Sequence, residues 1–348
     1  MAQPTTATER LPGAQAATVP EVPEVPRGVD HRAWSIRRRV LEHTISNGGG
    51  YLSQACSAAE IFACLYSGLM RLGPSAGAPV PEGFRATPGE DASVRLLGAD
   101  YNGRQSDTED RFLMSPAHYA LVLYAALIEA GRLDPAALED FNHDGSTVEM
   151  IGAEHSPGME ATTGSLGQAL AVVIGRALAR RRRGVTSRLW VLCSDGELQE
   201  GEMWESFALA SAYHLSEITM LIDANGSQCD GPVNEVLAIE PIAGRLSAFG
   251  WEVCEVDGHC PKAIWEAASA DHGERPLAVV CRTRPHAGIP SLVSRAPKFH
   301  YLRLGPDEAA RARADLEACR PDPGGERAGP RLPAEDLSGG AVASRGPA

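Results

Sequence analysis

A carboxylate and an amide stand just beyond the ends of two apolar segments, 30 residues apart. The apolar run LWVLC leads to Asp195, and the run ITMLI leads to Asn225. In an open sheet of alternating strands and helices, ligands bind beyond the carboxyl ends of the strands. Carboxylate and amide oxygens suit Mg²⁺, which completes its octahedral shell with phosphate oxygens, backbone carbonyls and water. The pair therefore predicts a site for Mg²⁺ and a diphosphate-bearing ligand, although S-D-G alone is also a common helix cap and D-A-N-G a common turn.

The segments around the pair alternate between strand-like and helix-like patterns. Continuous Val, Ile and Leu runs that alternate with helices are typical of a parallel sheet with helices on both faces. We expect strands over 188–193, 217–223, 251–256 and 277–283, and helices over 202–214, 241–249 and 261–270. The predicted fold class is therefore α/β. The strands that lead to Asp195 and Asn225 should be neighbours, because a single helix separates them.

The chain divides into a leader, an ordered domain and a tail. Apolar residues at helical spacing predict helices over 31–46, 56–71, 117–130 and 169–182, with a short segment over 134–141. The Pro- and Ala-rich stretch 1–29 predicts a disordered leader, and the Pro-, Gly- and Arg-rich stretch 306–348 predicts a disordered tail. The domain between them, 30–305, contains an aperiodic stretch over 73–109, which predicts a long surface loop.

Net charge and cysteine usage exclude several classes of protein. The formal net charge is −13, which argues against nucleic acid as a partner because such binding needs a basic surface. The basic cluster Arg180 to Arg183 falls at the end of a predicted helix, where it compensates the helix dipole. No apolar run is as long as a membrane span, the N-terminus has no secretory apolar region, and no two of the eight cysteines form a C-x-x-C pair. We therefore expect a cytoplasmic protein without a membrane span, zinc ribbon or disulfide framework.

The segment SDGELQEGEMWE…IDANGSQCDGP resembles the thiamine-diphosphate motif of the transketolase family, except that Ser194 replaces the family's first glycine. Four other segments resemble family blocks in the family's order: CSAAEIFACLYSGLMR, DRFLMSPAHYALVLYAAL, PGMEATTGSLGQALAVVIG and EPIAGRLSAFGWEVCEVDGH. The resemblance extends over residues 30–303. It implies the thiamine-diphosphate-binding fold, limited to the diphosphate-binding domain.

The resemblance implies how the metal and the cofactor diphosphate are held. Asp195 and Asn225 match the family's Mg²⁺ ligands, and the backbone carbonyl of Ser227 matches the third protein ligand. His118 matches a residue that contacts the diphosphate, and Gly196 matches a residue whose backbone approaches it.

Further matched positions lie near the thiamine rings and the subunit boundary. Gly164 and Leu166 match residues beside the aminopyrimidine and thiazolium rings. Glu200 matches a glutamate that reaches the subunit interface near the partner's catalytic glutamate.

Three segments depart from the family pattern on the substrate side. Tyr51 stands where the family's first glycine turn carries an active-site histidine. GAEHSPGME shortens the family segment that contains G-H-P, so that His155 is a candidate to replace its histidine. RTRPHAG replaces K-T-x-x-G-x-G, while PKFHY resembles PKWHG and makes His300 a candidate active-site histidine. Because tyrosine titrates near pH 10, Tyr51 would donate a hydrogen bond rather than shuttle protons at neutral pH.

The family's second domain carries the glutamate at the pyrimidine ring, and we expect no counterpart of it here, because the predicted tail 306–348 is unsuited to form another parallel-sheet domain. The resemblance therefore implies the N-terminal subunit of a two-component enzyme, completed by a C-terminal, pyrimidine-binding subunit in an α₂β₂ assembly. The implied activity is the transfer of a two-carbon unit between small molecules, with thiamine diphosphate and Mg²⁺. The alternatives are a component of a carboligase that decarboxylates a pyruvate-like 2-oxoacid and a non-catalytic scaffold paralogue. A Rossmann nucleotide site is disfavoured, because no G-x-G-x-x-G turn follows a strand.

Overall fold

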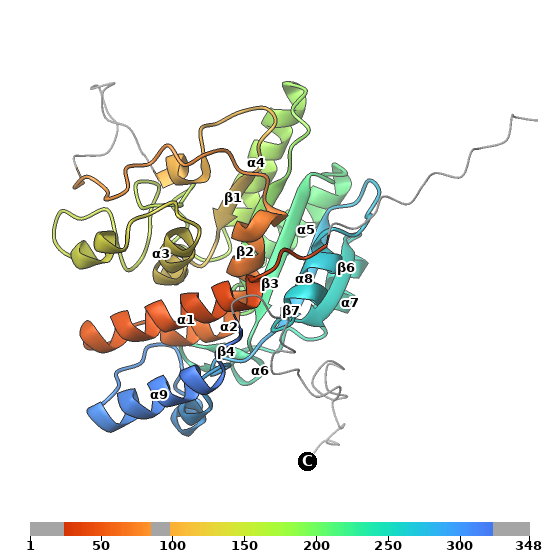
Figure 1. Cartoon of the computed structure of the whole chain (residues 1–348). Coiled ribbons are helices and arrows are strands. Elements are labelled where there is room, and N and C mark those ends of the chain that lie inside the picture. Colours follow the sequence, from red (N-terminus) through yellow and green to blue (C-terminus); the bar gives the residue numbers. More distant parts are fainter. Residues whose placement is uncertain (1–23, 85–97, 323–348) are drawn as a thin grey trace, which may run out of the picture.

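Five parallel strands form the central sheet of the molecule (Figure 1). The structure is a computed structural model that describes residues 24–84 and 98–322. In spatial order the strands are β1 (Arg111–Met114), β2 (Leu189–Ser194), β3 (Ile218–Ala224), β7 (Leu277–Arg282) and β6 (Glu252–Asp257), and every neighbouring pair is parallel. The expected α/β class is confirmed, and the two strands that lead to Asp195 and Asn225 are neighbours as predicted.

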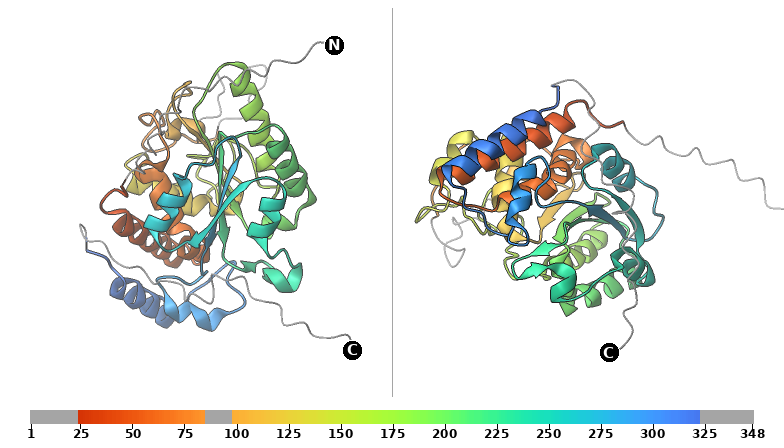
Figure 2. Two further views of the ribbon diagram at one scale, coloured as in Figure 1. Left: turned by 90° about the vertical axis from the view of Figure 1, so that its right-hand side faces the viewer. Right: turned by 90° about the horizontal axis from the view of Figure 1, so that it is seen from below.

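Alternate residues of each strand face two separate apolar cores, as the pleat of a strand requires. In β2, Trp190 and Leu192 face one core, whereas Val191 and Cys193 face the other. The first core is covered by α1 (Val29–Ser46), α2 (Leu52–Cys64), α3 (Ala120–Glu129) and α8 (Pro261–Ala268), and the second by α4 (Ala169–Arg182), α5 (Gly201–Ala212) and α7 (Ile242–Ala248). Figure 2 (left) shows these helices on both sides of the sheet.

Helix α2 lies in the interior of the molecule. Every residue from Leu52 to Cys64 is buried, and the helix contacts α1, α3, α8 and β3. It begins four residues before the predicted start at residue 56, directly after Tyr51. A π-helical turn, η1 (Leu65–Leu69), follows it and contains Gly68 with φ 127°. The prediction of one continuous helix over 56–71 is wrong at this point, because only glycine adopts such a backbone angle without strain.

Two features before α3 were not predicted. Strand β1 has four residues, all buried, and is too short to show a period. The stretch 73–109, predicted to be a surface loop, contains the 3₁₀ turn η2 (Gly98–Asn102), in which Tyr101 and Asn102 are buried. This part of the stretch packs into the domain, and its residues 85–97 lie outside the described part of the chain.

The prediction of a disordered tail from residue 306 is wrong for its first part, because helix α9 (Pro306–Ala318) packs on α1 (Figure 2, right). Ala309, Ala312 and Leu316 are buried, and Trp34 Nε1 donates a hydrogen bond to the Leu316 carbonyl (2.8 Å). The tail has few large apolar residues, so its composition suggested disorder. The helical spacing of these three small or apolar residues was the signal for a helix.

Short elements connect the layers. They are β4 (Ser227–Gln228) and β5 (Gly231–Pro232), which pair antiparallel, the helix α6 (Val233–Val236), and the 3₁₀ turns η3 (Ala117–Tyr119), η4 (Pro135–Asp140), η5 (Gly196–Gln199) and η6 (Pro290–Arg295). Of the predicted leader and tail, residues 1–23 and 323–348 lie outside the described residues. Val25, at the end of the predicted leader, packs against the first core. Among the described helices, none is long and apolar enough to cross a membrane.

Candidate active site

Asp195 and Asn225 meet at the carboxyl edge of the sheet. Strands β2 and β3 pair in parallel register to the last residue of β2, so the chain leaves both strands at the same level. Asp195 Oδ2 accepts a hydrogen bond from Gly226 N (2.6 Å), and Asp195 Oδ1 accepts one from Gly196 N (2.8 Å). The Asp195 carboxylate is therefore fixed against the segment that carries Asn225.

Asp223, which was not singled out from the sequence, holds the Asn225 side chain in place. Its buried carboxylate accepts hydrogen bonds from Ser57 Oγ (2.6 Å), Tyr119 Oη (2.7 Å), Asn225 Nδ2 (3.1 Å) and Thr283 Oγ1. With its amide nitrogen engaged in this way, Asn225 Oδ1 accepts from Ser227 N (2.9 Å) and keeps a second lone pair for another partner. An acid within the apolar run ITMLIDA was the available signal, because a buried carboxylate requires partners.

The Asp195 carboxylate lies in surroundings that disfavour its charge. Burial raises its pKa to about 7, against the lowering effect of the hydrogen bonds from Gly226 N and Gly196 N, and the Asp223 carboxylate raises it further. A cation beside Asp195 would offset this desolvation. Within the described residues, no group of three or more His, Cys, Asp and Glu could hold a metal ion. A cation here would therefore also need amide, carbonyl and ligand oxygens, a donor set that suits Mg²⁺ next to a diphosphate.

A cavity of about 410 Å³ opens in front of these residues. Among the residues predicted for the site, its walls contain His118, Leu166, Asp195, Gly196, Glu200, Asn225, Ser227 and His300. The remaining wall residues are Ser53, Gln54, Tyr119, Ser194, Gln199, Gln228, Cys229, Asp230, Val236 and Pro285. The volume lies within the range of small-molecule sites. The fold thus gathers residues from α2, the β1–α3 connection and the ends of three strands around one space.

Three rings predicted for the site lie close together, and two of them, those of His118 and His300, line the cavity, whereas Tyr51 does not. The Tyr51 ring centroid lies 5.4 Å from that of His118 and 5.3 Å from that of His300, and the two imidazole centroids are 5.0 Å apart. Burial lowers the pKa of His118 to about 3, with His300 adding to the effect, and burial also lowers the pKa of His300. Burial raises the pKa of Tyr51. At neutral pH the cluster is therefore uncharged and offers hydrogen-bond donors and acceptors.

His300 is held in place by the segment that leads into α2. Gly50 and Leu302 exchange two backbone hydrogen bonds, each 3.0 Å long. Ser53 Oγ donates a hydrogen bond to the Phe299 carbonyl (2.5 Å). These hydrogen bonds hold the segment that carries His300 against the connection between α1 and α2 and the first turn of α2.

His155 and Gly164 do not line the cavity. His155 Nε2 lies 3.0 Å from Glu149 Oε2, and the His155 ring packs against Phe84 with 4.7 Å between centroids. Gly164 is exposed, and a Cβ at this position would meet only the Ile151 side chain, at 3.7 Å. The structure therefore does not bring either residue to the cavity wall that contains Asp195.

The conformationally constrained glycine of the loop before α4 is Gly167. Its φ is +86°, and a Cβ there would lie 2.8 Å from the Cβ of Glu200. Its N–H donates a hydrogen bond to Glu197 Oε2 (3.1 Å). Glu200, which is exposed and immediately precedes α5, therefore borders the cavity beside a closely packed loop.

Glu197 is a second buried acid that was not singled out, although it directly follows the S-D-G segment. Its carboxylate accepts hydrogen bonds from Ser194 N and Ser194 Oγ (both 3.0 Å), and from Gly167 N and Ser115 Oγ. Burial raises its pKa even though these hydrogen bonds lower it. Glu197 therefore joins the ends of β1 and β2 to the loop before α4. The hydroxyl of Ser194, which stands in place of the family's glycine, takes part in this junction.

Comparison with known proteins places the chain among the transketolases. A family model described as "Transketolase, thiamine diphosphate binding domain" matches residues 95–321. A putative uncharacterized transketolase family protein of Sinorhizobium fredii is 37% identical over 291 residues, which cover 82% of this chain and 94% of that protein. One subunit of the apulose-4-phosphate transketolase of Actinobacillus succinogenes is 28% identical over 292 residues, which cover 83% of this chain and 96% of that subunit.

Solved transketolases share the fold. The crystal structure of transketolase from Campylobacter jejuni superposes with a TM-score of 0.66 at 22% identity, over 83% of this chain and 43% of that one. Transketolase from Leishmania mexicana gives a TM-score of 0.65 at 24% identity, over 89% of this chain and 43% of that one. The chain thus spans less than half the length of these transketolases, and at such identities the likeness concerns the fold. The match over residues 95–321 shows that the chain belongs to the transketolase family, as a thiamine-diphosphate-binding domain.

Proposed function

We propose that the chain is the N-terminal subunit of a two-component, thiamine-diphosphate-dependent transketolase-like enzyme that transfers a two-carbon unit from a donor to an acceptor. The observation that carries the proposal is the meeting of Asp195 and Asn225 at the wall of one cavity. Two relatives named as transketolase subunits support the division into two components: the apulose-4-phosphate transketolase subunit of Actinobacillus succinogenes, and 6-deoxy-6-sulfo-D-fructose transketolase subunit SqwG of a Clostridium species, 29% identical over 233 residues. The chain spans 96% and 74% of these subunits, against 43% of the solved transketolases.

The metal and the diphosphate would be held at the carboxyl edge of the sheet. Asp195, Asn225 and the backbone carbonyl of Ser227 would hold Mg²⁺, and Gly196 would leave room for the diphosphate beside the backbone. These donors are all oxygens, which suits Mg²⁺. When bound, thiamine diphosphate supplies a carbon centre that can accept electrons from a bond broken next to a carbonyl group.

Residues of the cavity wall would bind and orient the reacting molecules. His118, uncharged at neutral pH, would donate a hydrogen bond to a diphosphate oxygen. Leu166, which is 39% exposed, would offer an apolar surface to the thiamine rings, beside the loop of Gly164. His300 would donate a hydrogen bond to a substrate oxygen, and Tyr51, which does not line the cavity, would orient the His118 and His300 rings that it contacts. His155, outside the cavity wall, is not part of this proposal.

A separately encoded, pyrimidine-binding subunit would complete the site in an α₂β₂ assembly. Glu200 supports this arrangement, because its side chain is exposed at the cavity wall, where a second subunit can contact it. The eight cysteines carry free thiols, which agrees with a reducing compartment. The assembly is therefore proposed to work in the cytoplasm.

Reconstitution with the partner tests the function. The candidate partner is a chain of roughly 300 residues with the second domain of the family, a length typical of one or two domains. We expect the two chains together, with Mg²⁺ and thiamine diphosphate, to transfer a two-carbon unit from a ketose to an aldehyde. We expect neither chain alone to turn over.

Three other results would contradict the proposal, and each would favour a different function for the chain. Turnover by this chain alone would overturn the two-component proposal. Release of CO₂ from a 2-oxoacid donor would replace two-carbon transfer by decarboxylating carboligation. Failure of the reconstituted pair to bind thiamine diphosphate in calorimetry would indicate a non-catalytic scaffold.

A further inference from the structure

One face of the buried helix α2 reaches three different segments at the carboxyl edge of the sheet. Gln54 Nε2 donates a hydrogen bond to the His300 carbonyl (3.3 Å), and Ser57 Oγ donates one to the carboxylate at the end of β3 (2.6 Å). Glu60 contacts His259, in the connection between β6 and α8. Residues three apart lie on the same side of a helix. Gln54, Ser57 and Glu60 therefore form a row of polar residues on one side of α2 that contacts the segments around the site.

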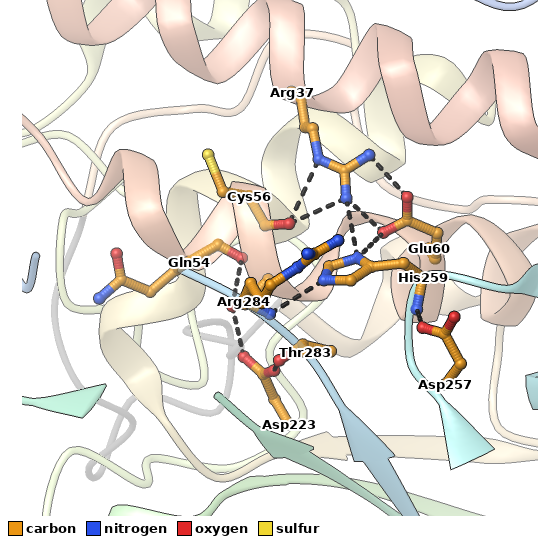
Figure 3. A network of polar contacts seen from close by, with 10 residues as sticks. Arg37, Gln54, Cys56, Glu60, Asp223, Asp257, His259, Thr283 and Arg284 are labelled. Carbon is orange, nitrogen blue, oxygen red and sulfur yellow. Dashed lines mark hydrogen bonds and ion pairs between the residues drawn. The ribbon is translucent and has the colours of Figure 1, made fainter. Parts of the chain in front are cut away.

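Glu60 is fixed by an arginine and a histidine in the interior (Figure 3). Arg37 Nη1 donates to Glu60 Oε1 (2.6 Å), and Arg37 Nη2 donates both to Glu60 Oε2 and to the Cys56 carbonyl (2.8 Å). His259 Nδ1 lies 3.2 Å from Glu60 Oε2. The exposed fractions are 6% for Arg37, 5% for Glu60 and 1% for His259. Burial by itself raises the pKa of Glu60, but Arg37 and His259 outweigh it and hold this pKa at about 2, so Glu60 is ionised at neutral pH.

The second ring nitrogen of His259 holds the chain beyond β7. Arg284 N donates a hydrogen bond to His259 Nε2 (2.9 Å; Figure 3). Because Nε2 accepts this hydrogen bond, it carries no proton, and a ring proton lies on Nδ1, which faces Glu60 Oε2 at 3.2 Å, with Arg37 Nη2 at 3.5 Å. Glu60 thus selects the tautomer that His259 needs in order to accept from Arg284.

The residues around Arg284 form part of the site. On one side, Thr283 Oγ1 donates a hydrogen bond to Asp223, the residue that orients Asn225. On the other side, Pro285 lines the cavity. The hydrogen bond to His259 therefore fixes the middle residue of the segment 283–285, in which Thr283 contacts Asp223 and Pro285 lines the cavity.

We propose that His259 is a positioning residue of this site, which fixes the segment 283–285 through Nε2 while Glu60 and Arg37 fix the imidazole. Its effect on catalysis rests on the proposed function. Neither His259 nor Glu60 lines the cavity, so neither is a catalytic residue. A buried Arg–Glu pair contributes little to stability compared with apolar side chains of similar volume. Orientation of the segment 283–285 accounts for these three polar side chains better than stability alone does.

Amide hydrogen exchange on the full-length chain, without cofactor or partner, tests the proposal directly. His259→Gln keeps a group that can accept from Arg284 N, whereas His259→Met has a similar size and no such acceptor. We expect the Arg284 amide to exchange on the order of tenfold or more faster in His259→Met than in the wild type, because its hydrogen bond then opens locally. In His259→Gln we expect a rate close to that of the wild type.

Two further variants make the result decisive. Val173→Ala removes apolar volume from the second core and shows how general destabilisation affects exchange. If His259→Met does not fold, His259→Asn replaces it, since asparagine keeps a polar contact with Glu60 but is too short to reach Arg284 N. Equal rates at Arg284 in the Gln and Met (or Asn) variants would overturn the proposal. An acceleration spread over the whole chain, as in Val173→Ala, would also overturn it.

The reconstituted enzyme adds a readout that a purely structural role would not change. At equal melting temperatures, we expect the KM for thiamine diphosphate to rise several-fold in His259→Met and to stay near the wild-type value in His259→Gln. An unchanged KM in His259→Met would contradict the proposed effect of His259 on cofactor binding. The exchange experiment needs no activity, so an inactive pair would count against the proposed function and not against this inference.

Discussion

Asp195 and Asp230 are carboxylates of the same cavity in different surroundings. Asp195 is buried and fixed by two backbone N–H groups, whereas Asp230 is exposed. We expect Asp195→Asn to weaken Mg²⁺-dependent binding of thiamine diphosphate by roughly 100-fold or more, because it removes the charge of the proposed metal ligand. Asp230→Asn should leave this affinity nearly unchanged. Titration calorimetry on the reconstituted pair measures both, and equal losses would mean that only the negative charge of the cavity matters.

Glu60 makes the stability of the chain depend on pH in a defined direction. Its pKa falls from an ordinary value of 4.5 to about 2 in the folded chain. A lowered carboxyl pKa stabilises the folded state fully above the ordinary value, and this contribution is lost as the pH falls through 4.5 toward 2. We therefore expect Glu60→Gln to lower the free energy of unfolding by about 3–5 kcal/mol at neutral pH, because Arg37 loses its buried carboxylate. The difference from the wild type should shrink in acid.

Urea unfolding of both chains from neutral pH to about pH 3 measures this difference. Glu129→Gln is the control, since it breaks the half-buried Arg39–Glu129 pair and should cost less than about 1 kcal/mol. A loss in Glu60→Gln that stays constant over the whole pH range would contradict the assignment of the pH dependence to Glu60.

The residues expected to bind ligands were easier to predict than the acids that support them. Asp195 and Asn225 follow apolar runs, and the position of a residue after a strand is enough to place it at the carboxyl edge of a parallel sheet. Asp223 and Glu197 take their donors from several distant segments, so their roles depend on contacts that no local pattern contains. His155 lies in a loop without a period, and the sequence could not tell which way that loop turns.

Helix α9 packs on α1, and Leu316 is the largest of its buried side chains. Its side chain is 2% exposed, and its carbonyl accepts the hydrogen bond from Trp34. We expect Leu316→Ala to reduce the free energy of unfolding by about 2–5 kcal/mol. Arg311→Ala, on the exposed face of the same helix, should change it by less than about 0.5 kcal/mol. Urea unfolding followed by circular dichroism measures both, and equal stability of the two variants would show that α9 does not unfold with the domain.

Elements with a continuous apolar pattern were predicted closely, whereas their order in the sheet was not. The helix over 169–182 was predicted with its observed bounds, and each of the four predicted strands lies within one residue of its prediction. The place of β7 between β3 and β6 could not be predicted, because a crossover can insert a later strand between two earlier ones. This insertion brings Thr283 beside Asp223. Part of the support of the site therefore follows from topology and not from local sequence.

The carboxyl edge of the sheet, where the strands end, exposes more apolar side chains around the cavity than are found near Tyr213 at the opposite edge, where the strands begin. At the carboxyl edge, Leu166 and Val236 line the cavity with exposed fractions of 39% and 43%, and the adjacent Leu237 is 54% exposed. At the opposite edge, between α5 and β3, Tyr213 is 51% exposed. Apolar side chains around a site that a second subunit would complete are suited to the core of an interface. The proposed partner should therefore dock over the carboxyl edge.

We expect Leu237→Asp to weaken association with the partner by roughly tenfold or more, because a carboxylate in the interface would lose its hydration without gaining a partner. Tyr213→Asp, a similar change at similar exposure, should leave association unchanged. Sedimentation of the reconstituted pair measures association, and circular dichroism of each variant checks the fold. Because the cofactor would be enclosed between the subunits, its retention in Leu237→Asp should fall with association and recover at higher partner concentration. Loss of the cofactor with intact association would instead mean that Leu237 contributes to the shape of the cavity. The partner would then dock on another surface.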